Sequence, residues 1–235
     1  MTSVVLIGGG RMGLLVRARL EQVGGFELLG TYDVSNAAEL DGTAPAADLA
    51  IDFSNKAALP HVLAYVRRTG AALLSGTTGF SDAELDELRA LGEATRVVHS
   101  ANYSRGVAVL RRMCAEAARA LGDWDAEIVE THHNQKADAP SGTAKLLLEA
   151  IDPAGEAPVA YGREGMVGAR PAGEVGMHSL RGGTVAGTHE VHFFGPDEEV
   201  CLTHRATSRQ IFVNGAVDCA QRLMVRPVAR FYTFD

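Results

Sequence analysis

The N-terminal half of the chain alternates short apolar runs with segments of helical spacing, and this alternation limits the fold more than any other feature. Five runs are typical of buried strands, because they are short, aliphatic and followed by Gly, Asp or Ser: SVVLIG, FELLGTY, ADLAIDFS, AALLSG and RVVHS. Helical segments separate them, among them RMGLLVRARLEQVG, KAALPHVLAYVRRTG and SDAELDELRALGEA. The pattern predicts an α/β fold with a Rossmann-like, doubly wound parallel sheet.

Two of these helices carry boundary signals. Pro60 is compatible with a helix only in the first turn or at a kink, because proline has no backbone N–H to donate. Ser81 followed by Glu84 has the spacing of a capping box, which predicts that the third helix begins there.

The second half has a different pattern. GVAVLRRMCAEAARALG predicts a long helix, AEIVETHH a strand and SGTAKLLLEAI a shorter helix. Residues 174–208 contain three strand-like segments, which predict a mostly antiparallel sheet in a second domain of α+β type. The helical segment QIFVNGAVDCAQRLMV is expected to pack back against the first domain. We therefore predict a dinucleotide-binding domain of residues 1–103 plus 209–235, and a substrate-binding and oligomerisation domain of residues 104–208.

Composition excludes several classes of protein. The chain has 235 residues, of which 46% are hydrophobic and 22% charged, as is ordinary for a globular protein. Its net charge of −7 disfavours nucleic acid and anionic membranes as partners. No apolar run approaches the roughly 18 residues of a membrane span, and the N-terminus lacks the basic region of a signal peptide. The three cysteines are widely spaced and predict neither a disulfide framework nor a metal-binding pair, so a cytoplasmic location is expected.

A G-x-G-x-x-G motif follows the first predicted strand and opens the first predicted helix. In that context Gly8 permits a tight turn, Gly10 lets the backbone approach a pyrophosphate, and Gly13 allows close packing of helix on strand. Asp33 ends the second strand, where an acid binds the ribose hydroxyls of a dinucleotide. Because Val34 is not basic, the sequence favours NADH, although Arg11 leaves NADPH open.

Polar residues also follow the fourth and fifth predicted strands. In a doubly wound sheet, ligands bind outside the carboxyl ends of the strands. Thr77 and Thr78 would lie there, near the nicotinamide half of a cofactor, and Asn102 could bind its carboxamide. Each signal alone is weak, because Gly-Thr-Thr-Gly and Asn are common in plain loops.

The segment VETHHNQKADAPSGTAK combines basic side chains with a turn that starts a helix. Neighbouring residues of a strand face opposite ways, so His132 and His133 cannot share one role if the strand continues through them. The free amides at the helix start form an anion site, and with Lys136 they predict a small dicarboxylate as substrate. The pair of histidines lacks a third ligand at zinc spacing, so no metal site is predicted.

Other basic residues lie in the strand-rich segment. His189, His192 and His204 are interpreted as strand residues and not as catalysts. Arg205 and Arg209 are candidates for contacts to a cofactor or a carboxylate.

Several motifs in order along the chain resemble the 4-hydroxy-tetrahydrodipicolinate reductase (dihydrodipicolinate reductase) family. They are G-x-G-R-M-G, D-F-S, G-T-T-G-F, A-N-Y-S, E-x-x-E-x-H-H-x-x-K-x-D-A-P-S-G-T-A, T-H-R-A-x-S-R and F-x-x-G-A. The block from Glu127 to Ala144 is highly specific, whereas the glycine motif alone is not. The resemblance spans nearly the whole chain.

The resemblance implies an NAD(P)H-dependent reductase of the diaminopimelate route to lysine, which is a cytoplasmic homotetramer with hinged domains. It implies that His132 is the proton donor or acceptor, that Lys136 is the second proton donor, and that substrate contacts come from His133, Ser141, Gly142 and Thr143. The implied cofactor-binding residues are Gly8, Gly9, Gly10, Arg11, Met12, Gly13, Asp33, Gly76, Thr77, Thr78, Ala101, Asn102, Tyr103 and Ser104.

Four positions depart from the family pattern. Asn134 and Gln135 stand where basic residues are frequent, Arg105 stands at a position that is usually aliphatic, and Val34 removes a basic residue that favours NADPH. The departures affect the predicted cofactor preference more than the predicted activity.

Two other functions remain as alternatives. One is another two-domain dehydrogenase, of a homoserine or aspartate-semialdehyde type. The semialdehyde type would need an activated cysteine, and Cys114 in the middle of an apolar helix is a poor candidate. A redox-sensing regulator would need a nucleic-acid or partner surface, which the charge disfavours.

Overall fold

The computed structural model describes residues 1–234, and the chain divides into two compact units. The first unit joins Met1–Ser104 to the segment that begins at Gln210, and the second unit is Arg105–Arg209. The last residue of the predicted dinucleotide-binding domain, Asp235, lies outside the described residues. Each unit has its own sheet and its own buried cluster of apolar side chains.

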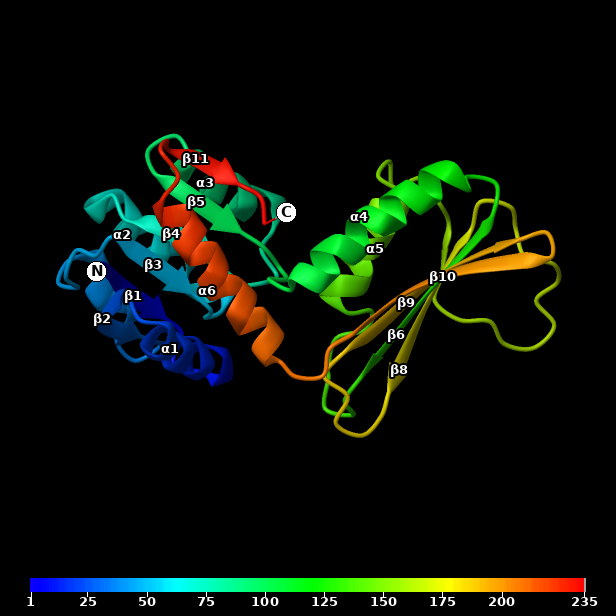
Figure 1. The fold of residues 1–235 in the computed structure, drawn as a ribbon, viewed down its shortest axis with the longest axis horizontal. Helices are drawn as coiled ribbons and strands as arrows, with labels where there is room; N and C mark the ends of the chain where they lie inside the picture. The colour runs from blue at the N-terminus through cyan, green and yellow to red at the C-terminus, as the bar shows by residue number, and fades with distance from the viewer. Residues whose placement is uncertain (235) are drawn as a thin grey trace. The chain divides into compact units, whose positions relative to one another are not determined.

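The first unit is a parallel sheet with helices, as the alternating pattern predicts (Figure 1). Its strands are β1 (Thr2–Ile7), β2 (Phe26–Tyr32), β3 (Leu49–Asp52), β4 (Ala72–Ser75), β5 (Arg96–His99) and β11 (Arg230–Tyr232). Its helices are α1 (Arg11–Val23), α2 (Leu59–Thr69), α3 (Asp82–Leu91) and α6 (Gln210–Met224), with short 3₁₀ turns at Ala37–Asp41 and Lys56–Ala58. The strand order is β11-β5-β4-β3-β1-β2, and all the pairs are parallel.

The boundary signals in this unit are confirmed. Pro60 lies in the first turn of α2, and Ser81 and Glu84 form the predicted capping box at α3. The last helix, α6, packs against α1 and the sheet, as expected. Strand β11 was not predicted, because it is three residues long and pairs with β5 far away in the sequence.

The second unit is a five-stranded sheet with two helices. Its elements are α4 (Arg105–Ala120), β6 (Asp125–His132), α5 (Gly142–Ile151), β7 (Val159–Ala160), β8 (Val175–Arg181), β9 (Thr188–Gly195) and β10 (Glu198–Arg205). The strand order is β10-β9-β6-β8-β7. Strand β9 is antiparallel to both of its neighbours, whereas β8 is parallel to β6 and to β7, so the sheet is mixed.

The three C-terminal strands of this sheet do not form a simple meander, because β6 lies between β8 and β9. One face of the sheet carries Ile128, Met177, Val191 and Phe193, which form one apolar cluster with side chains of α4 and α5. Figure 1 shows both helices on the same side of this sheet. Strand β6 is therefore hydrogen-bonded to β8 on one edge and to β9 on the other, and one of its faces packs against the apolar cluster. The strand that ends at the histidine pair is therefore a central one.

The long segment rich in Gly and Pro, residues 152–174, is tied to the sheet by ion pairs. Arg163 and Arg170 both bind the carboxylate of Glu127 on β6, at 2.8 and 3.2 Å. Burial alone would raise the pKa of Glu127, but hydrogen bonds from Arg163, His178 and Arg170 outweigh it and lower that pKa to about 2. The segment is thus fastened to the side of β6 away from the apolar cluster. Within residues 1–234 no helix combines the length and hydrophobicity needed to cross a membrane.

Candidate active site

The glycine-rich turn between β1 and α1 has a shape that only glycine permits at two positions. Gly8 has a φ of +113°, and a Cβ placed there would lie 2.4 Å from the carbonyl oxygen of Phe53. A Cβ on Gly13 would lie 1.8 Å from the carbonyl oxygen of Gly8, so the helix packs directly on the turn. A Cβ on Gly10 would meet nothing within 4 Å, and no side chain caps α1. The first amides of α1 therefore border an open space, which fits a dinucleotide pyrophosphate.

Asp33 borders the same turn. A Cβ on Gly9 would lie 2.9 Å from Oδ2 of Asp33, so the missing side chain keeps the approach to the carboxylate open. The hydroxyl and the backbone N–H of Ser35 donate to Oδ1 at 2.6 and 2.8 Å and lower the pKa of Asp33. The group is thus an ionised, exposed acceptor at the end of β2. Val34 beside it is 96% exposed and offers no charge to a phosphate.

The residues after β4 divide into buried and exposed ones. Thr77 is buried, and its hydroxyl accepts a hydrogen bond from the backbone N–H of Ser54 at 3.1 Å. A Cβ on Gly76 would lie 2.2 Å from the ring of Phe53, so only glycine fits beneath that ring. Thr78 is exposed. Of the two threonines, Thr78 is therefore the one that is free to face a ligand.

The residues after β5 are mostly internal. Asn102 is buried, and its Oδ1 accepts from the backbone N–H of Ser104 at 2.8 Å. The Tyr103 ring is buried against Phe53 and Phe234, and its hydroxyl donates to a backbone carbonyl at 2.7 Å. The Tyr103 side chain is a core residue, so any cofactor contact at this position comes from its backbone. Ala101 is exposed, like Arg11, whereas Met12 is half-buried.

Asp52, which the sequence analysis did not single out as a site residue, is a buried acid at the end of β3. Its carboxylate accepts hydrogen bonds from the hydroxyls of Ser54 and Ser75 at 2.6 and 3.0 Å. Burial raises the pKa of Asp52. These bonds join the ends of β3 and β4 next to Phe53, whose carbonyl contacts Gly8. In the sequence, the only sign of this role is that an acid ends the apolar run LAID.

The histidine pair lies where β6 ends. The strand alternates between buried and half-buried residues, and His132 and the fully buried Glu130 are on its buried side. His132 Nδ1 lies 2.5 Å from Oε2 of Glu130. Because a carboxylate only accepts, Nδ1 carries the hydrogen, and Nε2 is the atom free to exchange a proton. A Cβ on Gly187 would lie 3.0 Å from that Nε2, so glycine keeps its surroundings uncrowded.

Glu130 is held by Arg181 of β8. The guanidinium donates to both carboxylate oxygens, at 2.9 and 2.8 Å, and the backbone N–H of Ser141 donates to Oε1 at 3.1 Å. Burial alone would raise the pKa of Glu130, but the hydrogen bonds from Arg181 and His132 outweigh it and lower that pKa to about 2. The sequence analysis missed Arg181 and did not assign Glu130 a role. The i, i+2 spacing of Glu130 and His132 on one strand face was the available signal.

The charges around His132 act in opposite directions. Burial lowers the pKa of His132, the Glu130 carboxylate raises it, and Lys136 and Arg181 lower it again. The net shift is downward, so the neutral ring is favoured at neutral pH, and its Nε2 lone pair must take up a proton before it can give one. His189 packs edge-on against His132 with ring centroids 5.2 Å apart, and burial lowers the pKa of His189 to about 3.

Ser141 is the N-cap of α5. Its hydroxyl oxygen accepts from the backbone N–H of Ala144 at 3.2 Å and lies 3.1 Å from His189 Nε2. Gly142 follows it at the exposed surface with nothing near its missing side chain, and Thr143 is half-buried. The helix start that was predicted to bind an anion is therefore accessible and lies within hydrogen-bonding reach of the Glu130–His132 pair, since Ser141 contacts Glu130.

Lys136 and His133 lie in the turn that leaves β6. The backbone N–H of Lys136 donates to the carbonyl of His133 at 3.1 Å. The Lys136 ammonium pairs with Asp138 at 2.7 Å, and Arg209 donates to His133 Nε2 at 2.7 Å. Arg205, by contrast, is exposed and lies 3.5 Å from Glu190. The second unit thus gathers the residues predicted for substrate, and the first gathers those predicted for cofactor.

Comparison with known proteins identifies the family of both units. A family model described as the dihydrodipicolinate reductase N-terminus matches residues 2–103, and one described as the C-terminus matches residues 106–235. A 4-hydroxy-tetrahydrodipicolinate reductase of Akkermansia muciniphila is 41% identical over 96% of this chain and 94% of its own. One from Staphylococcus aureus is 40% identical over 99% of both chains.

Solved structures agree on the fold. A dihydrodipicolinate reductase from Paenisporosarcina sp. TG-14, solved with dipicolinate, aligns with a TM-score of 0.78 and 22% identity over 99% of this chain and 97% of that one. An NAD complex of GenD2 from gentamicin A biosynthesis aligns with a TM-score of 0.58 and 13% identity over 94% and 85%. With both of its units matched by the family models, and with relatives of about 40% identity along its full length, this chain belongs to the dihydrodipicolinate reductase family.

Proposed function

We propose that this chain reduces 4-hydroxy-tetrahydrodipicolinate to tetrahydrodipicolinate with loss of water, using NAD(P)H, in the diaminopimelate route to lysine. The observation that carries the proposal is the group formed by Glu130, His132 and Lys136 beside the start of α5. It combines a proton carrier, an ammonium and the backbone amides of a helix start, which a dicarboxylate reductase needs together.

The first unit would hold the cofactor. The open turn at Gly10 and the first amides of α1 suit the pyrophosphate, and the Asp33 carboxylate suits the ribose hydroxyls. When bound, the nicotinamide supplies a hydride to the substrate ring. Thr78 and Ala101 are exposed at the carboxyl ends of β4 and β5, where they would border that half of the cofactor.

The second unit would hold the substrate. The two carboxylates of the substrate need cationic or amide partners, and the amides of Gly142 and Thr143 at the start of α5 provide one set. Lys136 provides a charge, because substrate could displace Asp138 from its ammonium. His133 would contact substrate as well, with its ring oriented by Arg209.

His132 would move the proton. Reduction of the conjugated ring leaves negative charge on an enamine, and Nε2 of His132, once it has taken a proton from solvent, can pass that proton to the enamine. Glu130 holds the hydrogen on Nδ1, so the transfer occurs at Nε2. Lys136 would stabilise the developing charge and act as the second proton donor.

The preference for NADH is a proposal of its own. It is supported by the ionised Asp33 carboxylate, which would repel a 2′-phosphate, and by the exposed Val34, which offers no counter-charge. A cytoplasmic location and a homotetramer are proposed from the resemblance, and light scattering of the purified protein measures the second of these.

The proposal is tested by following the absorbance of reduced nicotinamide while the substrate is generated by the preceding synthase. Consumption of NADH or NADPH that depends on the synthase product is expected. If neither cofactor is consumed, the chain is not this reductase. A ratio of kcat/KM that favours NADPH would refute the cofactor preference alone.

A further inference from the structure

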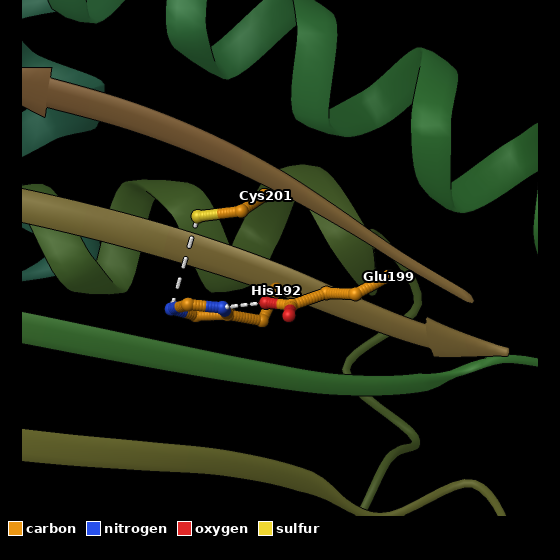
Figure 2. Close-up of side chains that lie close together, drawn as sticks. All are labelled: His192, Glu199 and Cys201. Carbon is orange, nitrogen blue, oxygen red and sulfur yellow. Dashed lines mark hydrogen bonds and ion pairs between the residues drawn. The ribbon is translucent and has the colours of Figure 1, made fainter. Parts of the chain in front are cut away.

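Away from the proposed active site, the second unit brings three side chains with metal-binding atoms together on its sheet. His192 lies on β9, and Glu199 and Cys201 lie on β10. One possible ligand atom from each lies within 4.8 Å of the others. Figure 2 shows the imidazole between the carboxylate on one side and the thiol on the other. No metal site was predicted from the sequence, because the pair of His132 and His133 lacks a third ligand and the cysteines form no metal-type pair; His192 and Cys201 are nine positions apart and come together only through the pairing of β9 and β10.

The strand pairing fixes the positions of these groups. Cys201 is directly opposite His192 in the antiparallel register of β9 and β10. Side chains opposite each other in such a pair have Cβ atoms about 4.5–5.5 Å apart. The imidazole also stacks on Phe194, with ring centroids 5.7 Å apart and an interplanar angle of 5°. The backbone and the stacked ring therefore hold the histidine in place without any ion.

Glu199 fixes which nitrogen of His192 is free. Its Oε1 lies 2.5 Å from Nδ1, and because a carboxylate only accepts, Nδ1 carries the hydrogen. The lone pair of a neutral His192 is then on Nε2, which faces Cys201 Sγ at 3.9 Å. A carboxylate on the far nitrogen is the usual arrangement around a metal-ligating histidine, where it sets the tautomer and the ring orientation.

The spacing fits a tetrahedral ion. Zinc binds sulfur at about 2.3 Å and imidazole nitrogen at about 2.0–2.1 Å, so two such ligands of one ion lie about 3.6 Å apart. The Sγ–Nε2 distance is 3.9 Å, which a side-chain shift of about 0.3 Å would close. A thiolate with an imidazole prefers zinc and cobalt to magnesium or calcium.

We propose that Cys201 Sγ and His192 Nε2 bind a zinc-class divalent ion, with Glu199 orienting the imidazole. The ion replaces the thiol proton, which passes to solvent, and water completes the coordination. This inference goes beyond the proposed reductase function and does not depend on it, because none of the three residues belongs to the proposed active site.

The test is a titration of the untagged, full-length protein with Co²⁺, followed by displacement with Zn²⁺. Binding of one Co²⁺ per chain, with the near-ultraviolet charge-transfer band of a cobalt–thiolate bond, is expected. Cys201→Ser should abolish the band. Glu199→Gln should weaken binding about 10- to 100-fold, the usual effect of removing the partner of a ligating histidine, and His192→Ala should weaken it at least as much.

His178→Ala is the matched control. His178 is a histidine of the same sheet that also pairs with a carboxylate, that of Glu127 at 2.7 Å. Among the described residues, no cysteine joins His178 and Glu127 in a group that could hold a metal. This variant should keep the band and the affinity. Absence of the band in the unaltered protein, its survival in Cys201→Ser, or equal affinities of His192→Ala and His178→Ala would each overturn the proposal.

Discussion

Replacing Glu130 with glutamine removes one charge from the centre of the second unit without changing the size of the side chain. Glu130 is fully buried and accepts from His132, from both terminal nitrogens of Arg181 and from the backbone of Ser141. An amide has one acceptor oxygen in place of two, and its NH₂ group must face a donor. The Arg181 guanidinium also loses its counter-charge.

The cost follows from the pKa of the carboxyl group. It falls from an ordinary value of 4.5 to about 2 in the folded protein, and at 1.36 kcal/mol per unit this is about 3 kcal/mol of stability. Because the pKa is lowered on folding, the unfolded chain binds the proton first as the pH falls. The stabilisation is therefore complete above about pH 5 and lost progressively as the pH falls towards 2.

The assay is urea unfolding of the full chain at pH 7 and at pH 3, with Glu127→Gln as the matched control. Glu127 also has a pKa of about 2, but it pairs with Arg163, Arg170 and His178 and not with His132. Both variants should be less stable at pH 7, with Glu130→Gln lower by about 3 kcal/mol, and both deficits should shrink at pH 3.

Activity separates the two variants. Glu130 holds the hydrogen on His132 Nδ1, so Glu130→Gln should lower kcat by at least about tenfold, whereas Glu127→Gln should keep kcat near that of the unaltered protein. The reasoning is refuted if Glu130→Gln unfolds with the original free energy at pH 7. It is also refuted if the two variants have equal kcat values.

Four further substitutions test the first unit. Gly13→Ala places a Cβ 1.8 Å from the Gly8 carbonyl oxygen, so it should lower the free energy of unfolding by about 1–3 kcal/mol and weaken NADH binding. Gly10→Ala should weaken NADH binding and leave the Tm unchanged. Thermal unfolding and titration of NADH fluorescence check both variants, and a normal Tm with normal NADH binding in Gly13→Ala would contradict the geometry. Asp33→Ser should raise the kcat/KM ratio of NADPH to NADH, and an unchanged ratio would show that this carboxylate does not select the cofactor. Tyr103→Phe should cost about 1 kcal/mol of unfolding free energy with an unaltered KM for NADH, and a large rise in that KM would place the hydroxyl in the cofactor site.

The fold of the first unit was largely predictable because its signals are local. Each strand is a short apolar run, and Ser81 with Glu84 marks a helix start within four residues. Strand β11 escaped because three residues carry no detectable period, and its position depends on β5. In the second unit the strands were predictable, but the place of β6 between β8 and β9 was not, since strand order depends on long-range pairing.

The candidate site shows the same limit. The glycine turn and the run from His132 to Lys136 stand out because their residues are neighbours in the sequence. Arg181 could not be found in this way, because it lies 51 residues from Glu130 and the parallel pairing of β6 with β8 brings them together. Cys201 and His192 likewise lie opposite each other only because of the register of β9 and β10, which no local sequence pattern encodes.

The most direct test of the account is a comparison of kcat with NADH affinity in His132→Ala and Lys136→Ala, with substrate generated during the assay. Both residues lie in the second unit, which is proposed to hold the substrate, whereas the first unit is proposed to hold the cofactor. Each variant should therefore lose at least about a hundredfold in kcat and bind NADH as the unaltered protein does. Full activity in both variants would contradict the account.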